Sequence, residues 1–323
     1  MATSYDILDL VGNTPMVQLK NLTKDIDAEV YVKLEYLNPS GSIKDRVAMR
    51  MIRDAERAGL LKEGMELIES TTGNMGTALA FAGAACGYPV TLYVPAGLVS
   101  EERMRIVKAY GAKIEEVNIE EVVTDDRFPQ GIHGAIVERI PRLVCEKREN
   151  EDKNVWWCRQ FANPSNEFAH RDTTGAEIVK QVDGDIDVFV AALGTGGTLL
   201  GVAEALKNAK SNAKIVAVEP KAHPTIIDGK LTLPDAEGTM SGGLLQEIVD
   251  RQILDEVFLV SDEDAIGTAH QLAEQEGLFC GMSSGANVFV ALQMAKKLGK
   301  GQKVVTILVD SRDRYLFTER FTT

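Results

Sequence analysis

The sequence predicts an α/β fold, in which two three-layer α/β domains are each built on a mostly parallel sheet. Short apolar runs rich in β-branched residues alternate along the chain with stretches of helical periodicity. Continuously apolar strands that alternate with helices are typical of parallel sheets covered on both faces. The chain has 323 residues, more than one typical hydrophobic core organises, which favours two domains.

The expected elements follow one another in this alternating order. Strands are predicted for the β-branched runs at residues 29–34, 66–69, 90–94, 187–192, 214–218 and 303–309. Helical periodicity marks residues 47–52, 76–82, 101–109, 199–207 and 262–276. Gly111 and Gly277 end the third and the last of these helices, and Ser261 with Asp264 predicts an N-terminal cap for the last.

The order of the elements suggests how the chain divides into domains. We expect a smaller, mobile domain with the substrate loop at residues 38–155, and a larger domain formed by residues 1–37 plus 156–323. The charged stretch at residues 145–153 is the best candidate for an exposed turn between them. The same stretch also fits a solvated helix end.

Composition excludes several classes of function. The formal net charge of −13 at pH 7 argues against a nucleic-acid partner, which would need a basic face. No apolar run reaches the roughly 18 residues of a membrane span, and residues 1–6 lack a signal-peptide pattern, so we expect a cytoplasmic protein. The four cysteines form no CxxC pair and the four histidines lack ligand spacing, so we expect reduced thiols and no metal site.

Lys44 is the first candidate for chemistry. It follows a turn rich in serine and glycine and precedes the predicted helix at residues 47–52. The field of a helix N-terminus, together with partial burial, favours the neutral amine, which is the form that attacks an aldehyde. Most lysines at helix starts are solvated surface groups, so this position alone does not decide the function.

A glycine-rich loop lies between the strand at residues 187–192 and the helix at residues 199–207. Its glycines let backbone amides approach a phosphate, and its threonines add hydroxyl donors. The rival interpretation is a dinucleotide fingerprint with Glu219 on the ribose, but Leu199 stands where the third glycine belongs. A simple tight turn also remains open. The residues of this loop are Gly194, Thr195, Gly196, Gly197 and Thr198.

Two further segments place polar groups at helix starts. Thr71, Thr72 and Gly73 precede the helix at residues 76–82, where amides and hydroxyls form a site for a carboxylate. Their alternative is an ordinary N-cap, while the amide of Asn74 is placed to donate to a phenolic oxygen of a cofactor. Ser283 follows a glycine-containing turn and is either a ligand of a cofactor or a helix cap.

Taken together, Lys44 and the segments at residues 71–76, 194–198 and 281–285 resemble the cysteine synthase and cystathionine β-synthase family of pyridoxal-phosphate enzymes. The likeness extends from Gly12 to Leu316. It implies pyridoxal 5'-phosphate in the cleft between the two domains, held by Lys44, with its phosphate on residues 194–198. It further implies Asn74 on the phenolic oxygen, Ser283 on the ring nitrogen, and Gln160 with residues 71–74 on the substrate carboxylate.

The resemblance also implies a reaction. Lys44 would anchor the cofactor and then act as the base in a β-replacement on a serine- or cysteine-type amino acid, with cysteine synthesis from activated serine and sulfide as the leading case. Ser283 is a hydroxyl rather than an aspartate, so the ring is a weaker electron sink and loss of a β-leaving group is favoured. The alternatives are cystathionine β-synthase, 2,3-diaminopropionate synthase and a cysteine lyase that releases hydrogen sulfide. A non-catalytic regulatory protein that binds pyridoxal phosphate is the alternative of a different class. We expect a homodimer with small amino-acid substrates.

Three segments depart from the family pattern. Ser70 replaces a usual proline and Met75 a usual threonine in the substrate loop. Residues 233–243 carry Asp235 and Glu237, which either tune the leaving group and nucleophile or belong to a solvated loop. The longer stretch at residues 123–133 is expected at the pocket wall or lid, and the sequence does not say which.

Overall fold

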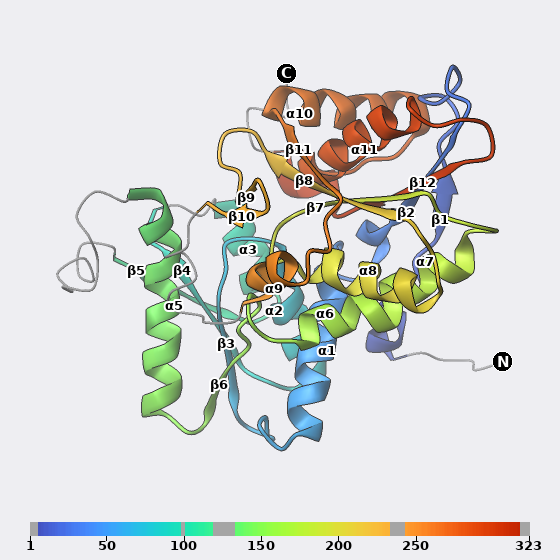
Figure 1. Ribbon diagram of the computed structural model, residues 1–323. Helices are drawn as coiled ribbons and strands as arrows, with labels where there is room; N and C mark the ends of the chain where they lie inside the picture. The colour runs from blue at the N-terminus through green and yellow to red at the C-terminus, as the bar shows by residue number, and fades with distance from the viewer. Residues whose placement is uncertain (1–5, 98–100, 119–132, 233–242, 317–323) are drawn as a thin grey trace.

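A computed structural model of the protein describes residues 6–97, 101–118, 133–232 and 243–316. Within these ranges the chain forms a six-stranded sheet, a four-stranded sheet and a two-stranded hairpin (Figure 1). Helices cover both faces of each larger sheet. The predicted α/β fold with mostly parallel sheets is therefore confirmed.

The larger sheet has the strand order β1-β2-β12-β7-β8-β11. Every neighbouring pair is parallel except β1 with β2, which is antiparallel. Strand β1 has no counterpart among the predicted strands, because three residues are too few to show a pattern. The strands of this sheet are β1 (Met16–Gln18), β2 (Glu29–Leu34), β7 (Val188–Ala192), β8 (Lys214–Pro220), β11 (Glu256–Val260) and β12 (Lys303–Leu308).

Alternate residues of β7 face opposite helical layers. Val188 and Val190 belong to the same core cluster as residues of α11 (Met282–Ala295), which packs against α10 (Asp262–Gln271). Phe189 and Ala191 share their cluster with α8 (Gly197–Asn208), beside α6 (Ser165–Ala169) and α7 (Ala176–Gln181). Figure 1 shows these two groups of helices on opposite sides of the sheet. Burial on both faces explains why the strand is apolar throughout.

The smaller sheet has the order β5-β4-β3-β6, and all its pairs are parallel. Leu67 and Leu92 pack against one helical layer, and Ile68 and Tyr93 pack against α5 on the other face. The elements of this half are α1 (Lys44–Arg57), β3 (Glu66–Ser70), α2 (Asn74–Cys86), β4 (Val90–Pro95), α3 (Glu101–Ala109), β5 (Lys113–Val117), α5 (His133–Glu151) and β6 (Val155–Trp157).

Strand β6 crosses the expected domain boundary between residues 155 and 156, so the division of the chain at these numbers remains a prediction. Residues 145–151 form the last turns of α5, and Asp152 donates its N–H to the Arg148 carbonyl. The charged stretch is therefore mainly a helix end rather than an interdomain turn.

Short elements complete the described chain. The cap predicted for α10 is confirmed, because the Ser261 hydroxyl accepts the Asp264 N–H over 3.1 Å. The predicted end at Gly277 is also confirmed, although the last residues before it form a π-helix. These elements are η1 (Ile7–Leu10), η2 (Glu35–Leu37), η3 (His170–Gly175), β9 (Ile226–Ile227), β10 (Lys230–Leu231), α9 (Leu244–Asp250), η5 (Leu272–Glu276) and η6 (Arg312–Tyr315).

A buried network of charges holds the start of α1 against the larger sheet. Arg46 donates to Glu35 over 2.7 Å and to Glu177 over 2.6 Å. Lys33 Nζ lies 2.7 Å from the other oxygen of Glu177. Because Lys33 is on β2 and Glu177 on α7, this network fixes the first turn of α1 at the junction of the two sheets.

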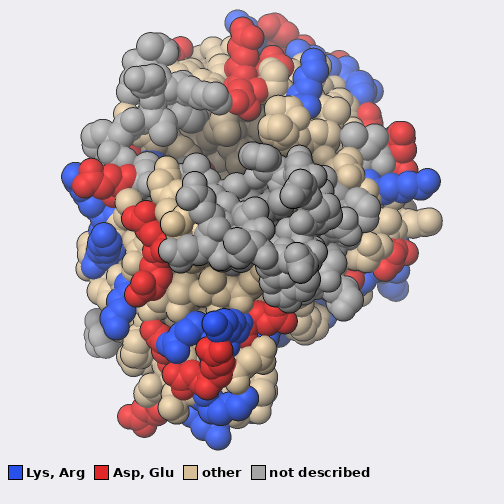
Figure 2. Space-filling model, turned by 90° about the vertical axis from the view of Figure 1, so that its left-hand side faces the viewer, with Lys and Arg blue, Asp and Glu red and all other residues tan. Residues whose placement is uncertain are grey.

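The surface carries charges of both signs. On the face shown in Figure 2, acidic and basic side chains lie interspersed rather than in separate areas of one sign. In the ranges that the structure describes, no helix has the length and apolar character needed to cross a membrane. The same ranges contain no cluster of three or more His, Cys, Asp or Glu side chains that could hold a metal ion.

Candidate active site

A cavity of about 290 Å³ lies beyond the carboxyl ends of β3, β7 and β12, which is where α/β proteins bind ligands. Thr72 lies instead at a smaller neighbouring cavity beside Arg142, and Gly197 faces Asn166 rather than the cavity. Asp235 and Glu237 fall outside the described residues, as does most of the stretch at residues 123–133. The predicted site residues that line the large cavity are Lys44, Thr71, Gly73, Asn74, Gln160, Gly194, Thr195, Gly196, Thr198 and Ser283.

Lys44 is the first residue of α1 and lines this cavity. Its backbone N–H donates to the Ser42 hydroxyl over 3.2 Å, and Ser42 forms a β-bridge with Asp310 after β12. Burial lowers the pKa of Lys44 from its ordinary 10.5 to about 8. A substantial fraction of the amine is therefore neutral near physiological pH, as attack on an aldehyde requires.

The glycine-rich loop leads from β7 to the N-terminus of α8. Gly196 has a φ of +91°, a left-handed conformation that favours glycine. A β-carbon on Gly197 would lie 2.1 Å from Asn166 Oδ1, so Asn166 can pack directly under the loop. Asn166 Nδ2 also donates to the Thr195 hydroxyl over 2.9 Å. The loop thus presents backbone amides and hydroxyls at a helix N-terminus, which is a site for a phosphate.

The contacts of Glu219 argue against the dinucleotide interpretation of this loop. Glu219 is buried and accepts the Ile226 N–H over 2.8 Å and the Thr225 N–H. Its carboxylate therefore stabilises the chain after β8 and is not available to bind a ribose. The Thr198 hydroxyl lies 3.3 Å from Nε2 of His170, whose pKa burial holds well below its usual range. His170 is therefore neutral and adds no positive charge beside the loop.

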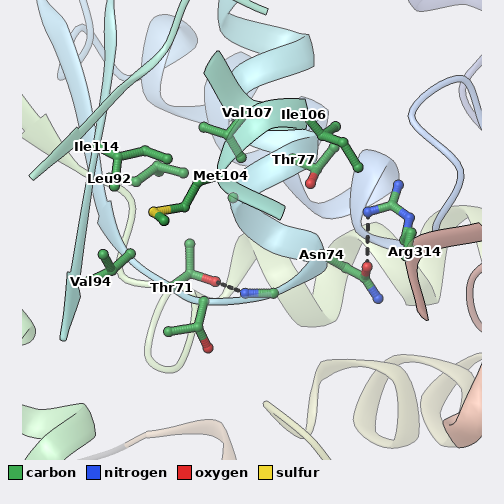
Figure 3. Close-up of a pocket in the computed structure, with 13 residues that line it drawn as sticks. Thr71, Asn74, Thr77, Leu92, Val94, Met104, Ile106, Val107, Ile114 and Arg314 are labelled. Atoms are coloured by element: carbon green, nitrogen blue, oxygen red, sulfur yellow. Dashed lines mark hydrogen bonds between the residues drawn. The ribbon is translucent and has the colours of Figure 1, made fainter. Parts of the chain in front are cut away.

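The substrate loop joins β3 to α2. The N-cap of α2 is Gly73 and no side chain caps it, so the interpretation of Thr71 or Thr72 as an ordinary N-cap is wrong. The Thr71 hydroxyl accepts only a long bond of 3.4 Å from the Gly73 N–H. Figure 3 shows this bond at the edge of an apolar pocket formed by residues of β4, α3 and β5. The first amides of α2 are thus open to a carboxylate.

Gln160 lies next to this loop and is held by Glu69. The buried Glu69 carboxylate accepts the N–H groups of Gln160 and Ser70, each over 2.8 Å, and the Trp157 indole N–H over 3.0 Å. The side-chain amide of Gln160 makes only a 3.4 Å bond to the Ser70 carbonyl. That amide can turn toward a substrate carboxylate without breaking a strong hydrogen bond.

Ser283 is the second residue of α11, whose N-cap is Gly281, so Ser283 does not cap the helix. The hydroxyl of the neighbouring Ser284 is used within the fold, where it accepts the Val309 N–H over 2.8 Å. One turn later, Asn287 is buried, lines the same cavity and donates to the Ile307 carbonyl over 2.9 Å. Its Oδ1 atom is buried without a hydrogen-bond partner among the described residues.

Sequence reasoning missed Asn287 and the groups around Asn74. Asn74 Nδ2 donates to Asp310 Oδ2 over 2.7 Å, and Arg314 donates to Asn74 Oδ1 over 3.0 Å. The spacing of four residues from Ser283 is the signal that would have drawn attention to Asn287. No sequence signal relates Asn74 to Asp310, which lies 236 residues away.

These residues fit pyridoxal phosphate. The largely buried Lys44 matches the aldehyde, the loop at residues 194–198 matches the phosphate, and Asn74 and Ser283 match the polar atoms of the ring. The buried Asn287 oxygen, which has no partner among the described residues, fits a polar ligand, because leaving such an acceptor unpaired costs roughly 1–3 kcal/mol.

The chain matches, over residues 7–310, the family described as pyridoxal-phosphate dependent enzyme, and it belongs to that family. It is an enzyme whose cofactor is pyridoxal phosphate. A cysteine synthase of Staphylococcus aureus is 40% identical to it over 314 residues, which are 97% of this chain and 96% of that protein.

Solved structures give the same result for the fold. An O-acetylserine sulfhydrylase isoform from Entamoeba histolytica has a TM-score of 0.84 and 34% identity, and covers 100% of this chain and 92% of its own. A hydrogen sulfide-producing enzyme from Fusobacterium nucleatum has a TM-score of 0.83 and 31% identity. The match covers 98% of this chain and 99% of that enzyme. An O-ureido-L-serine synthase has a TM-score of 0.83 and 34% identity. The match covers 99% of this chain and 96% of that synthase.

Proposed function

We propose that the protein is a cysteine synthase, which replaces the β-substituent of an activated serine with sulfide to give L-cysteine. The observation that carries this proposal is the meeting of Lys44, the glycine-rich loop and the N-terminus of α2 at one cavity. The identity of 40% to a cysteine synthase over nearly the whole chain supports the same reaction.

Lys44 has two roles in this proposal. Bound pyridoxal phosphate supplies an electron-withdrawing ring that acidifies the Cα–H of an amino acid linked to it. Lys44 would hold the cofactor through Nζ, and the same amine, when free, would serve as the base for the Cα proton. With a pKa of about 8, this amine is available as a base without strongly alkaline conditions.

The N-terminus of α2 and Gln160 hold the substrate carboxylate. The first-turn amides and the Thr71 hydroxyl supply donors on one side, and the Gln160 amide supplies them on the other. Met75 is buried and lines the cavity in place of the usual threonine. Binding of the substrate carboxylate therefore depends more on backbone amides and Gln160 than the family pattern implies.

Ser283 sets which reaction follows proton removal. Its hydroxyl makes no hydrogen bond to any described residue and faces the cavity, where it can donate to the ring nitrogen without holding it protonated. With such a donor, the bound cofactor would be a weaker electron sink than one whose ring nitrogen is protonated. Loss of the β-substituent, followed by addition of a nucleophile, is therefore the favoured course.

The purified protein tests this proposal directly. We expect it to be yellow and to form cysteine from O-acetylserine and sulfide, and we expect Lys44→Ala to abolish both properties. Lys62→Ala, which changes an exposed lysine on the same half of the molecule, is the matched control and should keep both. Cofactor binding that survives Lys44→Ala unchanged would contradict the role of Lys44.

The same assay separates the alternative reactions. Sulfide release from cysteine without synthesis would indicate a lyase, and one structural neighbour is a hydrogen sulfide-producing enzyme. Product formed only with homocysteine or with an amine would indicate cystathionine β-synthase or diaminopropionate synthase. Bound cofactor with no turnover of any donor would indicate a regulatory protein. The resemblance also supports a cytoplasmic homodimer, which sedimentation of the purified protein and localisation in cells would test.

A further inference from the structure

Asn74 is held by two oppositely charged side chains from the segment after β12. Asn74 Nδ2 donates to Asp310 Oδ2 over 2.7 Å, while Arg314 Nη1 donates to Asn74 Oδ1 over 3.0 Å. Figure 3 shows Arg314 approaching the amide oxygen of Asn74 at the start of α2. Asn74 belongs to the smaller-sheet half, and both of its partners belong to the chain that leaves the larger sheet.

The chemistry of these partners fixes which way the amide faces. A guanidinium can only donate hydrogen bonds, so the atom that faces Arg314 must be the amide oxygen. The Asp310 oxygen that faces Asn74 also accepts the Tyr315 hydroxyl over 2.6 Å, and an ionised carboxylate can only accept. The atom that faces Asp310 must therefore be the amide nitrogen. Both contacts select the same one of the two amide orientations.

The surroundings keep both charged partners in place. Asp310 is buried, and the Gly281 N–H, at the N-terminus of α11, donates to its backbone carbonyl over 3.0 Å. A helix N-terminus favours a negative charge nearby. Arg314 also donates to the Ser40 carbonyl, in the turn that leads to Lys44. The array thus connects the turn before Lys44, the start of α2 and the chain after β12.

We propose that Asp310 and Arg314 are positioning residues that hold the Asn74 amide with its nitrogen toward bound pyridoxal phosphate. The nitrogen carries two hydrogens and Asp310 takes one, so the second is available to the phenolic oxygen of the cofactor. In the opposite orientation the amide oxygen would face that phenolic oxygen, and two acceptors would repel. The inference rests on the cofactor role proposed above for Asn74.

Absorbance of the bound cofactor provides a readout besides activity, because its bands report whether the phenolic oxygen is ionised. Asn74 donating to this oxygen favours the ionised form. Asp310→Asn and Arg314→Met each release the amide, so we expect the ratio of ionised to un-ionised band to fall roughly 2- to 10-fold, the worth of one hydrogen bond. Asp313→Asn, an exposed acidic residue three positions along the same segment, is the matched control and should leave the ratio unchanged.

The sign of the Asp310→Asn effect separates positioning from simple electrostatics. Removing a nearby negative charge would by itself favour the ionised phenolic oxygen and raise the ratio. A raised or unchanged ratio in this variant would therefore overturn the inference. A lower thermal midpoint with an unchanged ratio would overturn it too, since it would show a merely structural role.

Variants in an Asn74→Ala background complete the test. If Asp310 acts through Asn74, Asp310→Asn should change the ratio in the parental protein and not in Asn74→Ala. An equal change in both backgrounds would overturn the positioning role while leaving the proposed function intact. If Asn74→Ala itself leaves the ratio unchanged, both the role of Asn74 and this inference are refuted, although cysteine synthesis remains separately measurable.

Discussion

The pKa of Lys44 provides a thermodynamic test of the site that needs no substrate. Burial lowers this pKa from 10.5 to about 8. A change of about 2.5 units corresponds to roughly 3 kcal/mol. The cavity leaves part of the side chain accessible, so this figure is an upper value. Between pH 8 and 10.5 the unfolded chain keeps the lysine proton that the native chain has released, so the free energy of unfolding rises with pH.

Lys44→Met removes the titrating amine and keeps a side chain of similar length. Without cofactor and below pH 8, the free energy of unfolding of the parental protein should be lower than that of Lys44→Met by up to about 3 kcal/mol. This cost should disappear as the pH rises from 8 to 10.5. The other titrating groups are the same in both proteins, so their contributions cancel in the difference in unfolding free energy. The dependence of this difference on pH therefore reports Lys44.

Urea unfolding of both proteins at several pH values measures this difference. Lys62→Met is the control, because an exposed lysine should give a difference that does not vary with pH. A constant difference between the parental protein and Lys44→Met from pH 7 to 10.5 would refute the lowered pKa. The amine would then be almost fully protonated at neutral pH, and the proposed attack on the cofactor aldehyde would lose its physical basis.

Two further variants test the cofactor cavity. Gly196→Ala forces a β-carbon onto a φ of +91°, a strain of roughly 1–2 kcal/mol. Because Gly196 lines the cavity, the loop relieves this strain by leaving its binding conformation, so the cofactor dissociation constant should rise about 5- to 30-fold. Gly277→Ala, at a φ of +71° outside the cavity, should lower stability without changing the dissociation constant. Asn287→Ala removes the buried oxygen that has no partner among the described residues. It should weaken cofactor binding roughly 2- to 10-fold, as measured by equilibrium dialysis. Unchanged binding would mean that the cofactor gives this oxygen no hydrogen bond.

Much of the fold could be predicted because its strands are buried on both faces. The run containing Val188, Phe189 and Val190 is apolar without interruption, since its alternate residues meet different helical layers. Strand β6 was not predicted, because three residues with two tryptophans fit a strand and a loop equally well. Its place beside β3 depends on pairing with residues about 90 positions earlier, which leaves no local pattern.

The candidate site divides in the same way. The loop at residues 194–198 could be predicted because helix starts next to glycines and hydroxyls bind anions through local geometry. Lys44 could be predicted because a helix N-terminus and partial burial favour a neutral amine. Their role in cofactor binding still rests on the family resemblance. The array of Asn74, Asp310 and Arg314 could not be predicted, since it forms only when the start of α2 meets the chain after β12.

The position of Lys44 also depends on residues that never reach the cavity. In the proposed reaction the Lys44 amine first holds the cofactor and later acts as a base, so the side chain has to move while the backbone stays fixed. Arg46, two residues along α1, supplies that fixed point through its buried pairs with Glu35 and Glu177. Removing one member of a buried ion pair typically costs 3–5 kcal/mol, because the other charge is left unpaired. The network therefore resists displacement of the first turn of α1 while the Lys44 side chain beyond Cα remains able to move.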